Sequence, residues 1–528
     1  ASVNDVHNID VLLGVNTNKE QAFSMYGYGL RGVSDDVYYY NPQKVPPVVN
    51  HGTPEFPDYA ATRYYSSDFT EKRMVSYFGR LGYNYKQRYL LEFTFRRDGS
   101  STFGEGNRWA NFPSVAVGWS FSEEPFIKRL TGGWLNWGKI RGSYGKSGQT
   151  FTSAYLAHGL MNIMDKSFFG KTGITTDKPV SPYLTWEKTR QYDLGLDMDM
   201  FNYRLNVKLD YYYKYTSSLI YDIPIPGSLY AFGAQVENAM EISNEGLELE
   251  LQADILRESA VSWRMKFNMA RNWNRFEKSY SGKDVVDGDG TLLVVGRPLN
   301  GLYVWAHRGY YNSDAEVPRL YKIDGQEIYF NGVATNGISG AVGDYRLLDL
   351  DGDGNPDSYY AGSPLPLAHG GWVNELMWKN FDLNVLVNFT IGRKMINNRM
   401  GLGFSRQSED GHLTKLFDYR KLRPWDGVNK KPNAPAWGNS LSMNTDSAIE
   451  KVHHLALKQI TLGYNLPDRI SKKAGLSGVR FFLTAENLFY LSNYSGGNPE
   501  VVNIYTGRDN GDTYPLPRKY TLGLTLNF

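Results

Sequence analysis

The segment 349–357 combines residue types and a spacing that could bind a metal ion. Acidic side chains stand at positions 1, 3, 5 and 9 of a calcium-loop pattern, and a glycine at position 6 allows a sharp turn. Hard cations require several oxygen ligands at about 2.3–2.6 Å, and alternate acidic residues on a folded loop supply them. The pattern predicts a structural Ca²⁺ site with the ligands Asp349, Asp351, Asp353, Asn355 and Asp357.

Two departures from that pattern favour a simpler alternative. Pro356 occupies position 8, and Tyr360 replaces the bidentate acid expected at position 12. Aspartate and asparagine also form solvated turns by accepting hydrogen bonds from nearby backbone. The segment is therefore either a calcium loop or an Asx-rich turn, and in both cases its role would be to hold a loop.

Aromatic residues in the long connections could contact a substrate. An aromatic ring can stack on a sugar ring or on a peptide side chain, and the candidates are Trp305, Tyr310, Tyr311 and Trp437. The alternative is that these rings pack loops against one another or belong to an aromatic girdle. No grouping of nucleophile, base and orienting residue stands out in the sequence, so we expect no catalytic site and no enzyme.

The elements that must position these residues are strands, and the last one is the clearest. From residue 519 to 528, polar or small residues alternate with the apolar residues Tyr520, Leu522, Leu524, Leu526 and Phe528. A period of two gives a strand with one apolar and one polar face. A final strand ending on an aromatic residue is typical of outer-membrane barrels, so we interpret these five residues as a targeting strand.

The same alternation recurs along the chain. Residues 203–215 alternate over thirteen positions, more than the roughly 9–11 that cross a bilayer at a tilt. One face of such strands carries charges and needs water, whereas the other needs lipid or a second sheet. We expect about fourteen strands, near residues 7–16, 73–86, 88–97, 112–121, 135–147, 184–199, 203–221, 243–255, 262–276, 366–378, 380–393, 453–464, 478–490 and 517–528.

The connections between these strands alternate in length. Short links fall at 86–88, 200–203, 257–261, 379–380 and 467–477, whereas long links span 17–72, 148–183, 277–365, 394–452 and 491–516. Short turns at one rim and long loops at the other are a property of outer-membrane barrels, in which the short side is periplasmic. The pattern favours an all-β, transmembrane antiparallel β-barrel.

Composition agrees with this class. The 528 residues carry a net charge of +2, which gives no argument for a nucleic-acid partner, and the chain contains no cysteine. Aromatic residues make up 15% of the chain, with 39 tyrosines. No apolar stretch approaches the roughly 20 residues of a transmembrane helix.

Several segments resemble the C-terminal barrel portion of SusC/RagA-type TonB-dependent transporters. The similarity lies in the order of many short motifs over nearly the whole chain. These motifs include residues 95–101 (FRRDGSS), 184–187 (LTWE), 195–197 (GLD), 244–248 (NEGLE), 349–354 (DLDGDG), 458–464 (KQITLGY), 486–489 (ENLF) and 494–500 (YSGGNPE).

The resemblance implies a 22-stranded barrel with a plugged lumen in the outer membrane of a Gram-negative bacterium, Bacteroidetes-like. Residues 1–528 would supply about the last fourteen strands, and the plug and the N-terminal strands would lie on a preceding segment. The implied activity is TonB-dependent import of an oligosaccharide or a peptide. The implied partners are a SusD-like surface lipoprotein, TonB through the N-terminal segment, the remaining barrel and plug, and outer-membrane lipid.

Two alternatives remain open at this point. A passive porin-like channel would have the same wall but neither a plug nor a TonB-binding segment. A secreted β-rich protein that binds or hydrolyses carbohydrate would have a packed core in place of a lipid-facing belt.

Overall fold

The computed structural model describes most of the chain. The residues it describes are 2–3, 6–29, 48–49, 59–60, 63–151, 153–159, 161–168, 171–176, 179–230, 232–257, 259–286, 292–317, 319–321, 327–329, 342–348, 350, 357–398, 423–428, 431–436, 445–473, 475–511 and 513–528.

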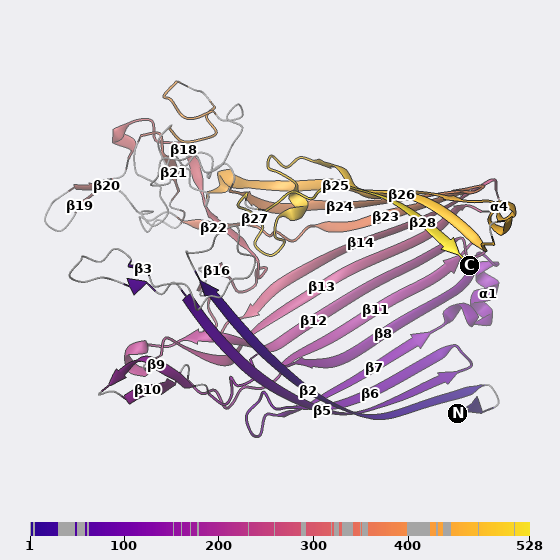
Figure 1. The fold of residues 1–528 in the computed structure, drawn as a ribbon, viewed down its shortest axis with the longest axis horizontal. Coiled ribbons are helices and arrows are strands. Elements are labelled where there is room, and N and C mark those ends of the chain that lie inside the picture. The colour runs from indigo at the N-terminus through magenta and orange to yellow at the C-terminus, as the bar shows by residue number, and fades with distance from the viewer. Residues whose placement is uncertain are drawn as a thin grey trace.

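Fourteen long antiparallel strands form one curved sheet in which neighbours in sequence are neighbours in space (Figure 1). They are β2 (His7–Gly29), β5 (Arg63–Tyr85), β6 (Tyr89–Ser100), β7 (Trp109–Trp119), β8 (Leu135–Gln149), β11 (Glu187–Met200), β12 (Leu205–Pro224), β13 (Ala234–Leu256), β14 (Val261–Lys278), β23 (Ala368–Trp378), β24 (Phe381–Asn397), β25 (Ile449–Asn465), β26 (Gly478–Ser492) and β28 (Lys519–Asn527). Each of the fourteen predicted ranges overlaps one of these strands. The prediction of an all-β antiparallel fold is confirmed.

Two strands are much longer than their sequence pattern indicated. β2 continues to Gly29 and β5 begins at Arg63, where the sequence favoured 7–16 and 73–86. The two strands stay in unbroken register from His7–Tyr85 to Gly29–Arg63. Polar residues occupy both faces of β2 at 16–21, so the period-two signal ends there although the backbone pairing continues.

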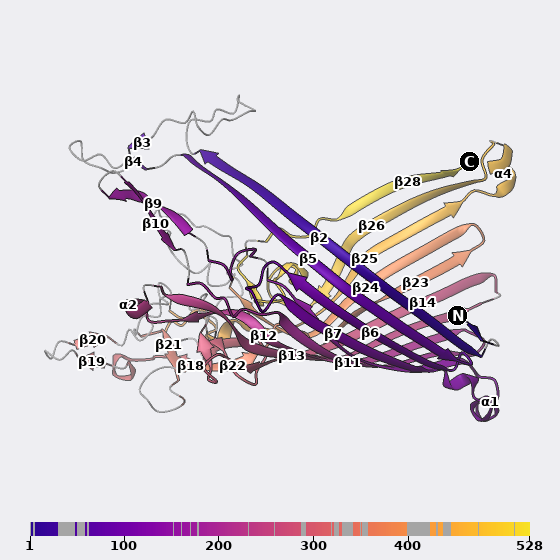
Figure 2. The same cartoon turned by 90° about the horizontal axis from the view of Figure 1, so that it is seen from below.

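The two ends of the sheet differ in their connections. At one end, here called the turn end, tight links join the strands, and both chain termini lie there together with α1 (Pro125–Thr131) and α4 (Asp468–Lys473) (Figures 1 and 2). The three residues 86–88 link β5 to β6. Lys86 and Gln87 are both at positive φ, and the Arg88 N–H donates to the Tyr85 carbonyl at 3.0 Å, as in a type I′ turn. The long connections all leave from the opposite end, here called the loop end.

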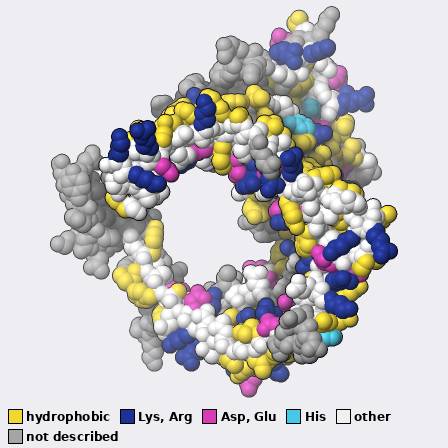
Figure 3. All heavy atoms as spheres, turned by 90° about the vertical axis from the view of Figure 1, so that its right-hand side faces the viewer, with side chains coloured by type: hydrophobic (Ala, Val, Ile, Leu, Met, Phe, Trp, Pro, Cys, Tyr) yellow, Lys and Arg dark blue, Asp and Glu magenta, His cyan; other side chains and the backbone are white. Residues whose placement is uncertain are grey.

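The sheet curls around an open centre (Figure 3). Its strand order runs from β1 (Ser2–Val3) and β2 at one edge to β28 at the other, and within the described residues these two edges are not paired with each other. A total of 22 strands for the complete barrel stays a prediction.

One face of the sheet forms a continuous apolar belt. A single row crosses six neighbouring strands in register, through Trp263, Leu376, Leu383, Leu462, Leu483 and Leu522. Its members are large; Leu462, Leu483 and Leu522 are exposed, Leu522 at 81%, and the other three are half-buried. Cross-strand neighbours on one face are the unit from which a sheet surface is built, and so many exposed apolar side chains in a row need an apolar solvent.

Buried clusters lie mainly at the loop end of the sheet. Phe103 and Trp186 pack with Phe112 at the loop end of β6 and β7, and Met240 packs with Phe276, Val285 and Leu293. The wall therefore has no central core, because its two faces meet two different surroundings, and the loops supply their own small cores.

Shorter elements lie at the loop end. They are β3 (Val48–Val49), β4 (Tyr59–Ala60), β9 (Met161–Phe168), β10 (Lys171–Thr176), α2 (Gly227–Tyr230), β15 (Val285–Val286), β16 (Leu292–Leu293), β17 (Leu302–Trp305), β18 (His307–Tyr310), β19 (Arg319–Tyr321), β20 (Glu327–Tyr329), β21 (Tyr345–Leu347), β22 (Ser358–Gly362) and β27 (Arg508–Asp509), with 3₁₀ turns at Asp314–Glu316, Asp446–Ala448 and Pro499–Val501. A further 3₁₀ turn, Phe121–Glu123, precedes α1 at the turn end. Among the described residues, none of the helices has the length and apolar character needed to cross a membrane.

Candidate functional site

The inner, concave face of the wall is polar and is crossed by ion pairs between neighbouring strands. Near one edge, Arg80 of β5 lies 2.8 Å from Asp10 of β2. Further along the wall, similar pairs join Lys266 to Glu375 at 2.7 Å and Arg480 to Asp382 at 2.5 Å. These pairs are partly exposed, so each contributes little to stability. Their arrangement matters more, because a surface of this kind requires water inside the wall.

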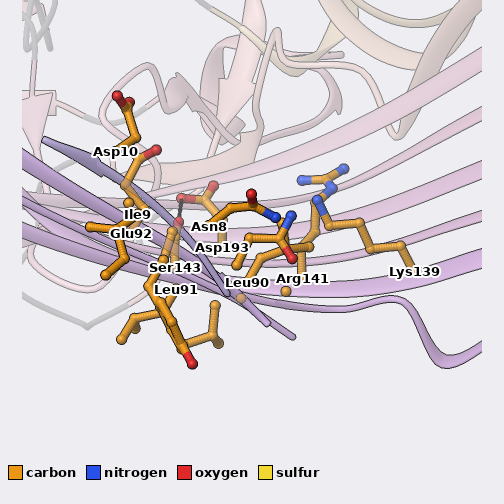
Figure 4. A pocket seen from close by; sticks show the side chains of 17 residues that line it. Asn8, Ile9, Asp10, Leu90, Leu91, Glu92, Lys139, Arg141, Ser143 and Asp193 are labelled. Carbon is orange, nitrogen blue, oxygen red and sulfur yellow. Dashed lines mark hydrogen bonds between the residues drawn. The ribbon is translucent and has the colours of Figure 1, made fainter. Parts of the chain in front are cut away.

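Two cavities lie on this inner face. The first, of about 700 Å³, is built by β2, β5, β6, β7, β8 and β11 near the turn end (Figure 4). Its charged lining combines Asp10, Glu92 and Asp193 with Lys139 and Arg141. The second, of about 620 Å³, is lined mainly by amides and charged groups of β12, β13, β14, β23, β24 and β25, including Asn206, Gln252, Lys266, Asn268 and Asn388. Apolar side chains also line both cavities, such as Leu90 and Val117 in the first and Leu251 and Phe389 in the second, so both surfaces are mixed.

One buried arginine holds the loop segment 499–503 against the inner wall, near the loop end. Arg393 of β24 is 4% exposed, and its guanidinium donates to the backbone carbonyls of Pro499, Val502 and Asn503 at 3.2, 2.9 and 2.7 Å. Glu500 of the same segment lines the second cavity and lies 3.3 Å from Lys458. The segment is therefore held against the wall beside the second cavity.

A second cluster joins two long loops above the wall. His307 of the 279–367 connection hydrogen-bonds Asp446 of the 398–448 connection through Nδ1, and Tyr359 donates to the same carboxylate at 3.2 Å. Tyr345 packs edge-on against the His307 ring and hydrogen-bonds Ser447 at 3.0 Å. Burial raises the pKa of the Tyr345 hydroxyl. These contacts join the described parts of the two connections, here called the loop unit.

Only one predicted calcium ligand falls among the described residues. The Asp357 carboxylate accepts a hydrogen bond from the Leu350 backbone N–H at 2.5 Å, and the Asp357 N–H donates to the Leu348 carbonyl at 3.0 Å. Asp349, Asp351, Asp353 and Asn355 lie outside the described part of the chain. In the described ranges, no group of three or more metal-ligating side chains occurs. The calcium site stays a prediction.

The predicted substrate-contacting aromatics divide into two kinds. Tyr310 and Tyr311 are 8% and 6% exposed, with the Tyr310 ring 5.3 Å from the Tyr345 ring, so contact with substrate would require the loops to part. Trp305 lines a cavity of about 1,020 Å³ together with Tyr303 and Arg508. Trp437 lies outside the described residues. Substrate contact by these four residues stays a prediction.

The final strand has the two faces that its alternation predicted. β28 pairs with β26, and the apolar side chains Tyr520, Leu522, Leu524, Leu526 and Phe528 are all exposed. Its role in targeting stays a prediction.

Sequence reasoning missed Arg393 and the His307–Asp446 contact. The partners of Arg393 lie 106 to 110 residues further along the chain, and His307 is 139 residues from Asp446. No local pattern could have identified either set.

Tilted antiparallel strands, an apolar outer belt and a polar inner face define the class as a transmembrane β-barrel wall. The sequence also matches the family described as "TonB dependent receptor-like, beta-barrel" over residues 3–363. The chain belongs to this family of outer-membrane receptors, which are transport proteins and not enzymes.

Individual relatives agree with that assignment. The chain is 32% identical to TonB-dependent receptor P26 of Formosa agariphila, over 88% of this chain and 47% of the relative. It is 29% identical to the TonB-dependent receptor SusC of Bacteroides thetaiotaomicron, over 89% of this chain and 45% of the relative. The chain thus spans about half the length of the curated relatives that it matches.

The fold has a solved counterpart in the RagAB peptide transporter. That structure superposes on the whole of this chain with a TM-score of 0.79 and 22% identity, and the match covers 54% of the RagAB chain. The predicted membership of the SusC/RagA type is confirmed, as is the outer-membrane location.

Proposed function

We propose that this chain supplies the barrel wall of a TonB-dependent importer for a nutrient, either an oligosaccharide or a peptide. The observation that carries the proposal is the polar, ion-paired inner face around an open centre, combined with the apolar outer belt. A wall of this kind encloses an aqueous path through lipid, and membership of the TonB-dependent receptor family supports an energised path.

The partners follow from the same proposal. TonB would bind a segment preceding the described wall and would transmit force to a plug in the lumen. A SusD-like lipoprotein would cap the loop end and deliver the cargo. The structured loop unit around His307 and Asp446 offers a rigid surface for such a cap. Co-purification of the lipoprotein with the complete protein, in detergent and under mild cross-linking, tests this step.

The cargo is an oligosaccharide or a peptide in this proposal. RagAB is a peptide transporter by its title, and the other relatives carry only receptor names. Uptake of a labelled oligosaccharide series and of a labelled peptide series into whole cells would separate the two classes. Saturation by one series and not by the other would assign the cargo.

Energy dependence separates the importer from a passive channel. Cells that carry the complete protein should lose uptake when TonB is deleted or when a protonophore collapses the inner-membrane gradient. A passive porin-like channel would keep its uptake under both treatments, and that result would overturn the proposal. The secreted carbohydrate-binding alternative is not supported, because the family is one of outer-membrane barrels.

We also propose that the 349–357 segment binds Ca²⁺ and fixes the loop that Asp357 already ties to Leu350. Its support is the spacing of the acidic residues, and its test is given in the Discussion.

A further inference from the structure

Three cations gather on the outward face of two adjacent strands. Lys146 of β8 and Arg190 of β11 are direct register partners, and Lys188 follows two residues away from Arg190 on the same face. All three side chains are exposed. We call these three residues the cation patch.

The face that bears the patch is the lipid-facing one. Two residues from Lys146 and Arg190, Tyr144 and Tyr192 pair in register, with ring centroids 4.8 Å apart. Beyond them the same face continues through the Ile140–Leu196 pair. The opposite face of the same strands carries Arg141 and Ser143, which line the inner cavity.

The height of the patch coincides with the end of the apolar belt. On β11 the outward residues are Met200, Met198, Leu196, Leu194 and Tyr192, and the next two are Arg190 and Lys188. The ten residue steps from Met200 to Arg190 span about 33 Å along the strand at roughly 3.3 Å each. At a strand tilt of about 40° this length rises about 25 Å along the membrane normal, which is the height of the apolar band in outer-membrane barrels. Both strands continue toward the long loops, so the patch lies at the extracellular surface of the bilayer.

Among the described residues, no acidic side chain forms an ion pair with this patch. Like charges directly opposite one another in a sheet destabilise it, yet in the described part of the chain none of the three cations forms an ion pair. Across β12 the register partner of Arg190 is Tyr215, whose hydroxyl already donates to Glu241. Glu187 is likewise engaged, since its Oε1 accepts from the Ile220 N–H at 2.9 Å.

A second pair of outward cations differs from the patch because an acidic side chain neutralises it. Lys19 of β2 and Arg73 of β5 are also direct register partners, but Glu71 lies between them, 3.1 Å from Lys19 and 2.6 Å from Arg73. There the protein supplies its own counter-ion. At the cation patch the described residues supply none, although Lys146 and Arg190 are placed side by side by the register in the same way.

We propose that the cation patch binds the phosphate group of an outer-leaflet lipid. An arginine guanidinium binds phosphate oxygens in a bidentate manner, whereas lysine adds a point charge. The Tyr144–Tyr192 pair beside the patch lies at headgroup depth, where amphipathic rings are enriched. The phosphate of such a lipid would neutralise the three cations. Its acyl chains would at the same time cover the adjoining apolar belt. The proposal rests on the outer-membrane location and is independent of the cargo.

The test uses the complete protein, purified from outer membranes in a mild detergent and examined by native mass spectrometry. We expect the wild type to retain phosphorylated lipid, and the K146Q/K188Q/R190Q variant to retain at least tenfold less. A matched control, R129Q/K472Q/K473Q, removes one arginine and two lysines that are exposed on α1 and α4 at the turn end, and it should retain the wild-type amount. Equal retention by the patch variant and the control would overturn the proposal.

Two further measurements keep the proposal testable if the triple variant assembles poorly. K146E places an acid opposite Arg190, so this variant should fold at least as well as the wild type and still lose the lipid. Retention of lipid by folded K146E would count against the site. Inorganic phosphate added to the wild type should not displace the lipid. Complete displacement by phosphate alone would indicate a site for a free anion and would overturn the assignment to lipid.

Discussion

Arg141 of β8 reaches across the whole of strand β11 to Asp210 of β12, with 2.5 Å between Nη2 of the arginine and Oδ1 of the aspartate. The Nε atom of the same arginine lies 3.0 Å from Oδ2 of Asp197 on β11. The residue between Arg141 and Asp210 in the register is Gly195. A Cβ atom at Gly195 would fall 2.4 Å from the Arg141 guanidinium carbon. The missing side chain is what allows one cation to tie three strands.

Replacing Gly195 by alanine should therefore displace Arg141 and weaken the three-strand tie. The flexible, partly exposed Arg141 side chain can move away from the new methyl group, so the cost is the loss of its two partly exposed ion pairs, about 0–1 kcal/mol each. The free energy of unfolding, measured by urea titration of the assembled barrel with gel mobility as readout, should fall by that order. Gly142→Ala is the matched control, because its new Cβ would meet only ordinary contacts at 3.8 Å. Equal destabilisation by both variants would contradict this explanation.

Removing the Arg393 side chain should release the segment that contains Glu500. Three backbone carbonyls lose their donor, and leaving buried polar groups unpaired costs about 1–3 kcal/mol each. We expect Arg393→Ala to make residues 494–511 sensitive to added protease and to speed amide exchange there, while the rest of the wall is unchanged. Arg393→Lys keeps the charge but cannot supply the same fork of donors, so it should behave like alanine. Full protection in the lysine variant would indicate that charge alone matters.

The loop tyrosines predict a response to alkaline pH. Burial, and then the neighbouring Tyr360, raise the pKa of Tyr303 to about 12, and burial also raises the pKa values of Tyr310 and Tyr345. A tyrosine in an unfolded loop titrates near 10. Between pH 10 and 12 the unfolded loop would lose a proton that the folded loop keeps, so the stability of the loop unit should fall as pH rises.

Phenolate absorbance and protease sensitivity, recorded over the same pH range, check this expectation. A late fraction of the phenolate signal should appear above pH 10 and should coincide with cleavage in the 302–347 region. Tyr303→Phe removes one late-titrating group and should reduce that fraction. Titration of every tyrosine near pH 10 would contradict the prediction.

Chelation should loosen the 349–357 segment if that segment binds Ca²⁺. A site with several carboxylate ligands should hold about one ion per chain, measurable by elemental analysis of the purified complete protein. EDTA should increase cleavage in this segment, and Ca²⁺ should restore protection where Mg²⁺ does not. The double variant D351N/D353N should carry no ion, whereas Asp314→Asn, in a separate loop turn, should carry the normal amount. Unchanged metal content in the double variant would exclude these ligands.

Loss of the final aromatic residue should impair assembly of the barrel. Phe528 is 93% exposed at the end of the outermost described strand, so its removal costs the fold almost no packing. A large drop in the assembled fraction of a Phe528-deleted variant, in membrane fractions from cells, would then reflect recognition during targeting. Phe528→Tyr should assemble normally. Normal assembly of the deletion variant would refute the interpretation of β28 as a targeting strand.

The wall could be read from the sequence because its signal is local. In β12, alternate residues such as Leu205, Val207 and Leu209 face one way and Asn206, Lys208 and Asp210 face the other, and the backbone geometry of a strand permits no other arrangement. The short turns and long loops followed from the same pattern. Only the ends were misjudged, as in β2, where pairing continues after the alternation stops.

The loop unit, the Arg393 contacts and the cation patch came only from the tertiary structure. Arg393 meets residues more than 100 positions away, and the repulsion between Lys146 and Arg190 exists only because one particular register sets them side by side. Alternation along one strand fixes which face a side chain occupies, but says nothing about its partner on the next strand. That partner depends on register and on how the loops fold back, and both are decided by contacts between distant parts of the chain.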